Sequence, residues 1–133
     1  MNKEDIPSLG VAELSTLIKD RSVSPVEATQ AYLDRIDSLD FKFNSYLTVA
    51  RNQALEAAQE AEQAIAGGNY LGPMHGIPVA VKDQFLSKGI RSTGGSKFLV
   101  DFVPDYDATV IANLKKAGAI VLGKTNLTEF AIG

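Results

Sequence analysis

Two short apolar runs in the second half of the chain constrain its fold more than any other feature of the sequence. Residues 77–81 (IPVAV) and 119–122 (AIVL) are apolar without alternation, which is typical of strands buried on both faces, as in a parallel sheet. The intervening residues 107–118 have helical spacing, with Asp107 as the expected N-cap and Gly118 just past the end. Strand, helix and strand in this order predict a βαβ unit with a right-handed crossover.

The first half of the chain is typical of helix. Ser8 is the expected cap of a first helix over the apolar residues that follow it. Residues 24–27 (SPVE) give a clearer start, because serine at the N-cap, proline at the first helical position and glutamate at the third form a capping box. A third helix is expected over residues 48–66, which are rich in Ala, Glu and Gln and are followed by Gly67.

These elements predict an α/β protein, in which N-terminal helices are followed by the first strands and the crossover helix of a mostly parallel sheet. A length of 133 residues fits one domain, so residues 1–133 are expected to form a single unit. Residues 1–68 are its helical lead-in, and residues 72–133 begin the α/β core. Because a sheet buried on both faces needs more covering than these helices supply, we expect the N-terminal fragment of a larger domain.

Composition excludes several kinds of site. The chain has no cysteine and one histidine, which exclude disulfides, thiolate metal sites and multi-histidine zinc sites, and no metal site is expected. A net charge of −3 gives no basic surface for a nucleic-acid backbone. No apolar run approaches the roughly 18 residues of a membrane span, and no leader peptide opens the chain. We therefore expect a cytoplasmic protein without a membrane partner.

A phosphate-binding pattern occurs near the end of the chain. Residues 118–125 (GAIVLGKT) satisfy G-x-x-x-x-G-K-[ST]. A P-loop follows a strand and opens a helix, whereas here a helix precedes Gly118 and the intervening residues are themselves the expected strand. The pattern is interpreted as accidental, and a P-loop nucleotide binder remains the less favoured alternative.

Lys82 stands at the end of the first apolar run. A lysine at the end of a buried strand is expected to be desolvated, which lowers its pKa and lets it act as a neutral base. Ligand crevices of open α/β sheets also form at strand ends. The alternative is a solvated lysine at the strand end, paired with Asp83 or with another carboxylate. His75 is expected to pack on its neighbours in a loop, and residues 92–96 (STGGS) to form a turn.

Three segments of the chain resemble the amidase signature family. They are residues 72–98 (GPMHGIPVAVKDQFLSKGIRSTGGSKF), residues 107–133 (DATVIANLKKAGAIVLGKTNLTEFAIG) and the lead-in 22–36 (SVSPVEATQAYLDRI). The resemblance implies an incomplete amidase signature fold. It also implies hydrolysis of carboxylic amides to an acid and ammonia or an amine by a Ser–cis-Ser–Lys triad, without a cofactor.

The resemblance assigns the catalytic lysine to Lys82, and suggests Asp83, Thr93, Thr125 and Asn126 as supporting residues. The family's nucleophile, its cis-serine and its oxyanion loop belong to a later Gly/Ser-rich segment, roughly Gly-Gly-Ser-Ser-Gly-Gly-Ser, which these residues do not contain. A lysine base without its serine cannot perform covalent catalysis. The chain alone is therefore expected to be inactive.

Two further interpretations stay open from the sequence. Within the family, the chain could belong to the A subunit of the glutamine-dependent aminoacyl-tRNA amidotransferase, whose partners are a tRNA and a B subunit. Outside it, the chain could be a non-catalytic interaction module. The expected partner is otherwise a small-molecule amide, and a homodimer is one assembly that the resemblance allows.

Overall fold

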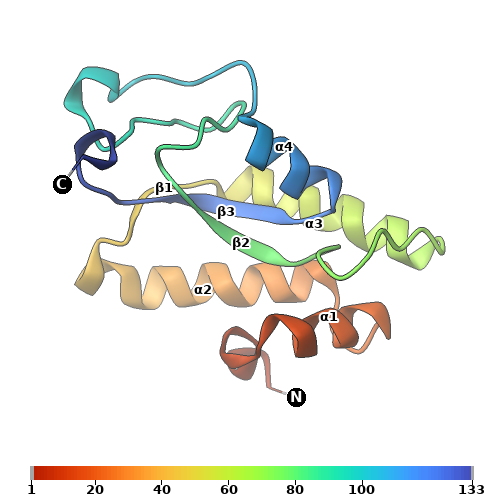
Figure 1. Ribbon diagram of the computed structural model, residues 1–133. Coiled ribbons are helices and arrows are strands. Elements are labelled where there is room, and N and C mark those ends of the chain that lie inside the picture. Colours follow the sequence, from red (N-terminus) through yellow and green to blue (C-terminus); the bar gives the residue numbers. More distant parts are fainter. Residues whose placement is uncertain (1, 133) are drawn as a thin grey trace.

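The computed structural model describes residues 2–132 (Figure 1). Met1 and Gly133, the two ends of the expected unit, lie outside the described residues. Within residues 2–132, no helix is both long and apolar enough to cross a membrane. The regular elements are, in chain order, η1 (Lys3–Ser8), α1 (Val11–Lys19), α2 (Pro25–Phe43), β1 (Tyr46–Val49), α3 (Arg51–Ala66), β2 (Pro78–Lys82), η2 (Lys97–Leu99), α4 (Thr109–Lys116), β3 (Ile120–Thr125) and η3 (Glu129–Ala131).

The strands form one small sheet in the order β1-β3-β2. β3 is the central strand, and it runs parallel to β2 and antiparallel to β1. Helices α1 and α2 lie along one side of the sheet, and α4 lies on the other side (Figure 1). The predicted α/β class is confirmed, and its β2–α4–β3 segment is the predicted βαβ unit. The sheet is mixed, with one parallel and one antiparallel pair.

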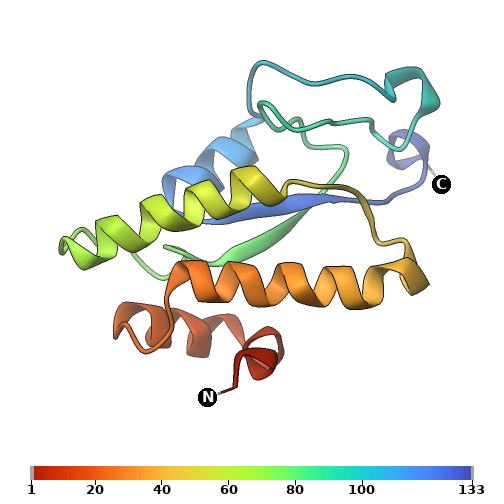
Figure 2. The same ribbon diagram turned by 180° about the vertical axis from the view of Figure 1, so that it is seen from behind.

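The central strand β3 is buried on both faces, as its unbroken apolar run predicts. Ile120 and Leu122 pack with Leu33 of α2 and Ala58 of α3, and the view from behind shows α3 lying across β3 beside α2 (Figure 2). Val121 belongs to a second cluster that includes a buried isoleucine of α4. The same strand thus contributes to the core on each side of the sheet, and its burial is a main source of hydrophobic stabilisation.

The parallel partner β2 is less buried than predicted. Val81 is buried, but Ala80 and Lys82 are exposed. Within residues 2–132, β2 has a neighbouring strand on one side only. The prediction of a strand buried on both faces therefore holds only at the start of β2, where Pro78 is buried, and fails for Ala80 and Lys82 on the same face.

β1 was not expected from the sequence. The predicted third helix began at Thr48, whereas α3 begins at Arg51 and residues Tyr46–Val49 form a strand. Tyr, Thr and Val favour a pleated strand, and the Ala50 N–H continues the pairing by donating to the carbonyl of Leu122 at 2.8 Å. The predicted helical lead-in of residues 1–68 therefore supplies a strand to the same sheet as the later residues.

The helix-start signals in the first half had different outcomes. The capping box of α2 is confirmed, because Ser24 Oγ accepts from the Glu27 N–H at 3.1 Å and the Glu27 carboxylate accepts from the Ser24 N–H at 2.8 Å. Ser8 is not the N-cap of α1. It ends the 3₁₀ helix η1, and Gly10 is the N-cap of α1.

Asp107 was also predicted to cap a helix, and this prediction is wrong. The N-cap of α4 is Ala108, which makes no side-chain capping bond. The Asp107 carboxylate instead accepts from the Lys88 N–H at 2.7 Å and pairs with Lys115 at 2.9 Å. Burial acts to raise the pKa of Asp107, but the bonds from Lys115 and Lys88 outweigh burial and hold the pKa below its usual value. Asp107 therefore ties the preceding loop to α4.

Candidate active site

Lys82 is the last residue of β2 and lies opposite Thr125 of β3 in the parallel register. Its side chain is exposed, and among residues 2–132 its ammonium makes no hydrogen bond or ion pair. The desolvation expected for a lysine at this position is therefore not provided by the described residues. The alternative pairing with Asp83 is not seen either, because Asp83 pairs with a different lysine.

Asp83, the next residue, is held through its backbone and its carboxylate. It is 1% exposed. Its N–H donates to the carbonyl of Thr125 at 3.0 Å, and its own carbonyl accepts from the Gly94 N–H at 3.1 Å. Carboxylate oxygen Oδ2 accepts from the backbone N–H of Thr93 at 2.9 Å and from its hydroxyl at 2.5 Å. The backbone immediately after Lys82 is consequently fixed on both sides.

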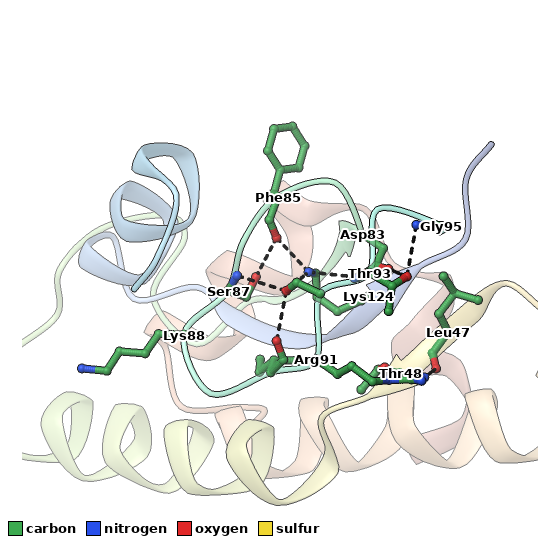
Figure 3. A network of polar contacts seen from close by, with 12 residues as sticks. Leu47, Thr48, Asp83, Phe85, Ser87, Lys88, Arg91, Thr93, Gly95 and Lys124 are labelled. Atoms are coloured by element: carbon green, nitrogen blue, oxygen red, sulfur yellow. Dashed lines mark hydrogen bonds and ion pairs between the residues drawn. The ribbon is translucent and has the colours of Figure 1, made fainter. Parts of the chain in front are cut away.

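The second carboxylate oxygen of Asp83 faces a buried lysine (Figure 3). Lys124 Nζ lies 3.2 Å from Asp83 Oδ1 and also donates to the carbonyl of Phe85 and to Ser92 Oγ, each at 2.7 Å. The Lys124 side chain is fully buried. Burial lowers the pKa of Lys124 from its ordinary value, and the Asp83 carboxylate opposes that effect.

An irregularity in β3 aims Lys124 at this carboxylate. Val79 pairs with Val121 and Ala80 pairs with Gly123, so Leu122 is an extra residue on β3. Side chains of a regular strand alternate between faces, and an inserted residue reverses the alternation beyond it. Lys124 therefore shares the face of Val121 rather than the face of Leu122.

Two of the supporting residues suggested from the sequence meet Asp83. Thr93 contacts it through its hydroxyl and its N–H, and Thr125 through its carbonyl. Asn126 lies apart. It is exposed, its side-chain oxygen accepts from the N–H of Leu127, and its own N–H donates to Ser45.

Sequence reasoning missed Lys124, which was treated as part of an accidental pattern. The signal that could have found it was a single charged residue within an apolar strand, because a buried ammonium needs a counter-ion. The strand interpretation of residues 118–125 is confirmed: Gly118 follows α4, and residues Ile120–Thr125 form β3. An extended segment of this kind cannot wrap its amides around a phosphate.

A hollow of about 430 Å³ lies between α3, α4 and the amino end of β3, and Lys82 does not line it. Its lining includes His75, Gly118 and Ile120, the first residue of β3. Ligands of open α/β sheets bind beyond the carboxyl ends of the strands. Because Lys82 ends β2 and lies outside the lining of this hollow, the candidate active site is the carboxyl end of the strands.

His75 packs in the fold, as its loop position predicts. It is 3% exposed, stacks on Tyr70, and its Nδ1 accepts from the Leu71 N–H at 3.1 Å. A protonated imidazole has no free acceptor, and burial lowers the pKa of His75. The neutral ring is therefore the form that fits this site.

Acidification is expected to destabilise the protein through His75. Below about pH 6.5, the ordinary histidine pKa, the unfolded state binds a proton that the folded state does not. The free energy of unfolding contributed by His75 is thus present at pH 7.5 and falls as the pH drops from about 6.5 towards the lower folded pKa. Urea unfolding at pH 7.5 and 5.5 measures this loss. His75→Asn, which keeps an acceptor, should lose less stability over that interval than the wild type, and an equal loss would contradict this account.

The sequence of the chain is similar to that of known amidases and amidotransferases. A family model described as Amidase matches residues 27–133. The A subunit of the glutamyl-tRNA(Gln) amidotransferase of Geobacter sp. (strain M21) is 49% identical over 129 residues, which cover 97% of this chain and 26% of that protein. The corresponding protein of Geobacter metallireducens is 50% identical over 125 residues, covering 94% of this chain and 26% of the relative.

Solved structures of amidases are also similar to this chain. The native peptide amidase from Stenotrophomonas maltophilia superposes with a TM-score of 0.90 at 35% identity, covering 96% of this chain and 26% of that one. A structure of fatty acid amide hydrolase gives a TM-score of 0.88 at 26% identity, covering 96% and 23%. The chain thus spans about a quarter of the length of these proteins. Since the family model matches well over half of its residues, the chain belongs to the amidase (amidase signature) family.

Proposed function

We propose that this chain is the N-terminal part of an amide hydrolase and that Lys82 is its general base. One observation carries the proposal. Lys82 presents an exposed ammonium group without a partner among residues 2–132, at the carboxyl end of β2 and directly before the anchored Asp83. The nearby charged groups of Asp83 and Lys124 are paired with each other, whereas Lys82 is free to face residues that follow in a longer protein.

The proposed chemistry is acyl transfer through a serine. In its deprotonated form, Lys82 takes a proton, through the bridging cis-serine, from the hydroxyl of a serine in the later Gly/Ser-rich segment, and that oxygen attacks the amide carbon. The C–N bond breaks, and the proton passes to the departing ammonia or amine. Water then cleaves the acyl ester, which releases the acid and restores the serine. Lys82 serves as base and acid in turn.

Two relatives support an amide as the substrate class. The peptide amidase and the fatty acid amide hydrolase that share this fold are named for amide substrates. The part of the chain that positions Lys82 is the part they share. A non-catalytic interaction module is less well supported, because nothing in that alternative accounts for a free lysine at the strand end.

A second candidate is the A subunit of a glutamyl-tRNA(Gln) amidotransferase. The specific observation favouring it is sequence identity, which is 49% to 50% for the Geobacter proteins and 35% for the peptide amidase. In that role the same Lys82 chemistry would release ammonia from glutamine for transfer to a mischarged tRNA, and the partner would be a B subunit. The cytoplasmic location and a homodimer stay predictions.

Ammonia release by the full-length protein tests the proposal. We expect hydrolysis of glutamine or of a small primary amide, together with labelling by a fluorophosphonate that reacts with activated serines. Ammonia release from glutamine that rises on addition of glutamyl-tRNA(Gln) and a B subunit would favour the amidotransferase. A folded full-length protein that hydrolyses no amide and takes up no label would contradict both candidates.

A further inference from the structure

The buried Lys124 calls for an explanation beyond stability. The Lys124 ammonium donates to Phe85 O and Ser92 Oγ and forms an ion pair with Asp83 Oδ1 (Figure 3), an oxygen that has no hydrogen-bond partner among the described residues. Replacing a buried ion pair by apolar residues of similar volume is often neutral or stabilising. We therefore consider the position that Lys124 imposes on its three partner groups, rather than a contribution to stability.

These contacts join β3 to residues 83–92, which precede Lys124 by at least 32 positions in the chain. Lys124 belongs to the central strand β3, Asp83 directly follows β2, and Phe85 with Ser92 belong to the loop that leaves it. Ser92 Oγ is itself fixed, because it donates to the carbonyl of Ile90 at 3.0 Å. Lys124 is the only described side chain that contacts all of these groups at once.

The position of Lys82 depends on this cluster. Its backbone is joined directly to Asp83, whose carboxylate is held on one oxygen by Lys124 and on the other by Thr93. We propose that Lys124 is a positioning residue for Lys82: through Asp83 it fixes the end of β2, so that the Lys82 amine stays within reach of the cis-serine hydroxyl. This inference rests on the proposed function of Lys82.

Loss of Lys124 leaves the Asp83 carboxylate buried without its cation. An unpaired buried charge is expensive, so the carboxylate must take up a proton or move towards water, and the end of β2 moves with it. A displacement of about 1 Å of a catalytic group can cost about 100-fold in rate. Since a general base acts in the transition state, the loss should fall on kcat and leave KM unchanged.

The test uses two variants of the full-length protein and one matched control. Lys124→Met removes the charge at similar volume and is expected to lower kcat about 100-fold. Thr93→Val keeps the shape and the backbone N–H but removes the hydroxyl, which donates to Asp83 and accepts from the Gly95 N–H, and is expected to lower kcat about tenfold. Thr29→Val is the control, because Thr29 is fully buried in α2 and its hydroxyl has no partner among the described residues. It should leave kcat unchanged.

The diagnostic readout is the same set of variants in a Lys82→Ala background. If Lys124 and Thr93 act through Lys82, their substitution causes no further loss of kcat there, although thermal stability falls equally in both backgrounds. Should Lys124→Met fail to fold, Thr93→Val decides the question. The inference is overturned if these variants keep wild-type kcat, or if they lower it by the same factor without Lys82. Failure of the proposed function is a separate outcome, namely an active Lys82→Ala enzyme.

Discussion

Lys82→Ala is expected to lower the kcat of the full-length enzyme by about 10²- to 10⁴-fold, the usual contribution of a general base. A serine hydroxyl is a weak nucleophile until a base takes its proton, and alanine offers no base. Because the Lys82 side chain is exposed and unpaired within residues 2–132, the fold should persist. Steady-state hydrolysis of an amide, with circular dichroism on the same samples, measures both quantities.

Lys116→Ala is the matched control for Lys82. Lys116 is also exposed, lies in the last turn of α4, and forms no ion pair among the described residues. Its removal should leave kcat and KM unchanged. Wild-type amide hydrolysis by a folded Lys82→Ala protein would end the assignment of Lys82 as the base.

Gly123→Ala is expected to be strongly destabilising, by about 3 kcal/mol, at the upper end of the range for overpacked sites. A methyl group at Gly123 would overlap the carbonyl oxygen of Thr48 and would lie 3.0 Å from the Cα of Val49. Both contacts are with the backbone of β1, which cannot yield without breaking its pairing with β3. Urea unfolding of the variant and the wild type measures the difference.

Gly67→Ala provides the comparison for Gly123. Gly67 has an ordinary φ of −77° at the end of α3, and an added methyl would meet its nearest atoms at 3.4 and 3.5 Å. The free energy of unfolding should change by no more than about 0.5 kcal/mol. If Gly123→Ala were as stable as Gly67→Ala, the claim that the backbone of β1 lies too close to Gly123 for a methyl group would be contradicted.

Local signals in the sequence predicted local structure well. The capping box of Ser24 and Glu27 depends on residues three positions apart, and it forms as expected. Gly118 follows α4 with the positive φ of +85° that its position predicts. In both cases the energy that decides the conformation comes from neighbours in the chain.

Structure that depends on distant partners could not be predicted in this way. Residues Tyr46–Val49 are too few to show a periodic pattern, and they form a strand because β3 lies beside them. The extra residue Leu122 arises from the register of β3 against β2. No pattern in β3 alone reveals that register, so the sequence could not predict which face of the sheet carries the side chain of Lys124.

In the candidate site, too, some residues could be predicted from the sequence and one could not. Lys82 was identified from the family resemblance, and the contacts of Asp83 with Thr93 follow from a short loop between them. Lys124 was missed because its partner Ser92 lies 32 positions earlier in the chain. Its partners become apparent only when β3 and residues 83–92 are brought together.

Formation of an acyl-enzyme tests the central claim most directly. The full-length wild type and Lys82→Ala are each mixed with an amide substrate, quenched in acid at short times, and measured by intact-protein mass spectrometry. If Lys82 is the base that activates the serine, the wild type gains the mass of the acyl group within a turnover. The variant should then gain it at a rate lower by about 10²- to 10⁴-fold. Acylation of Lys82→Ala at the wild-type rate would contradict the account.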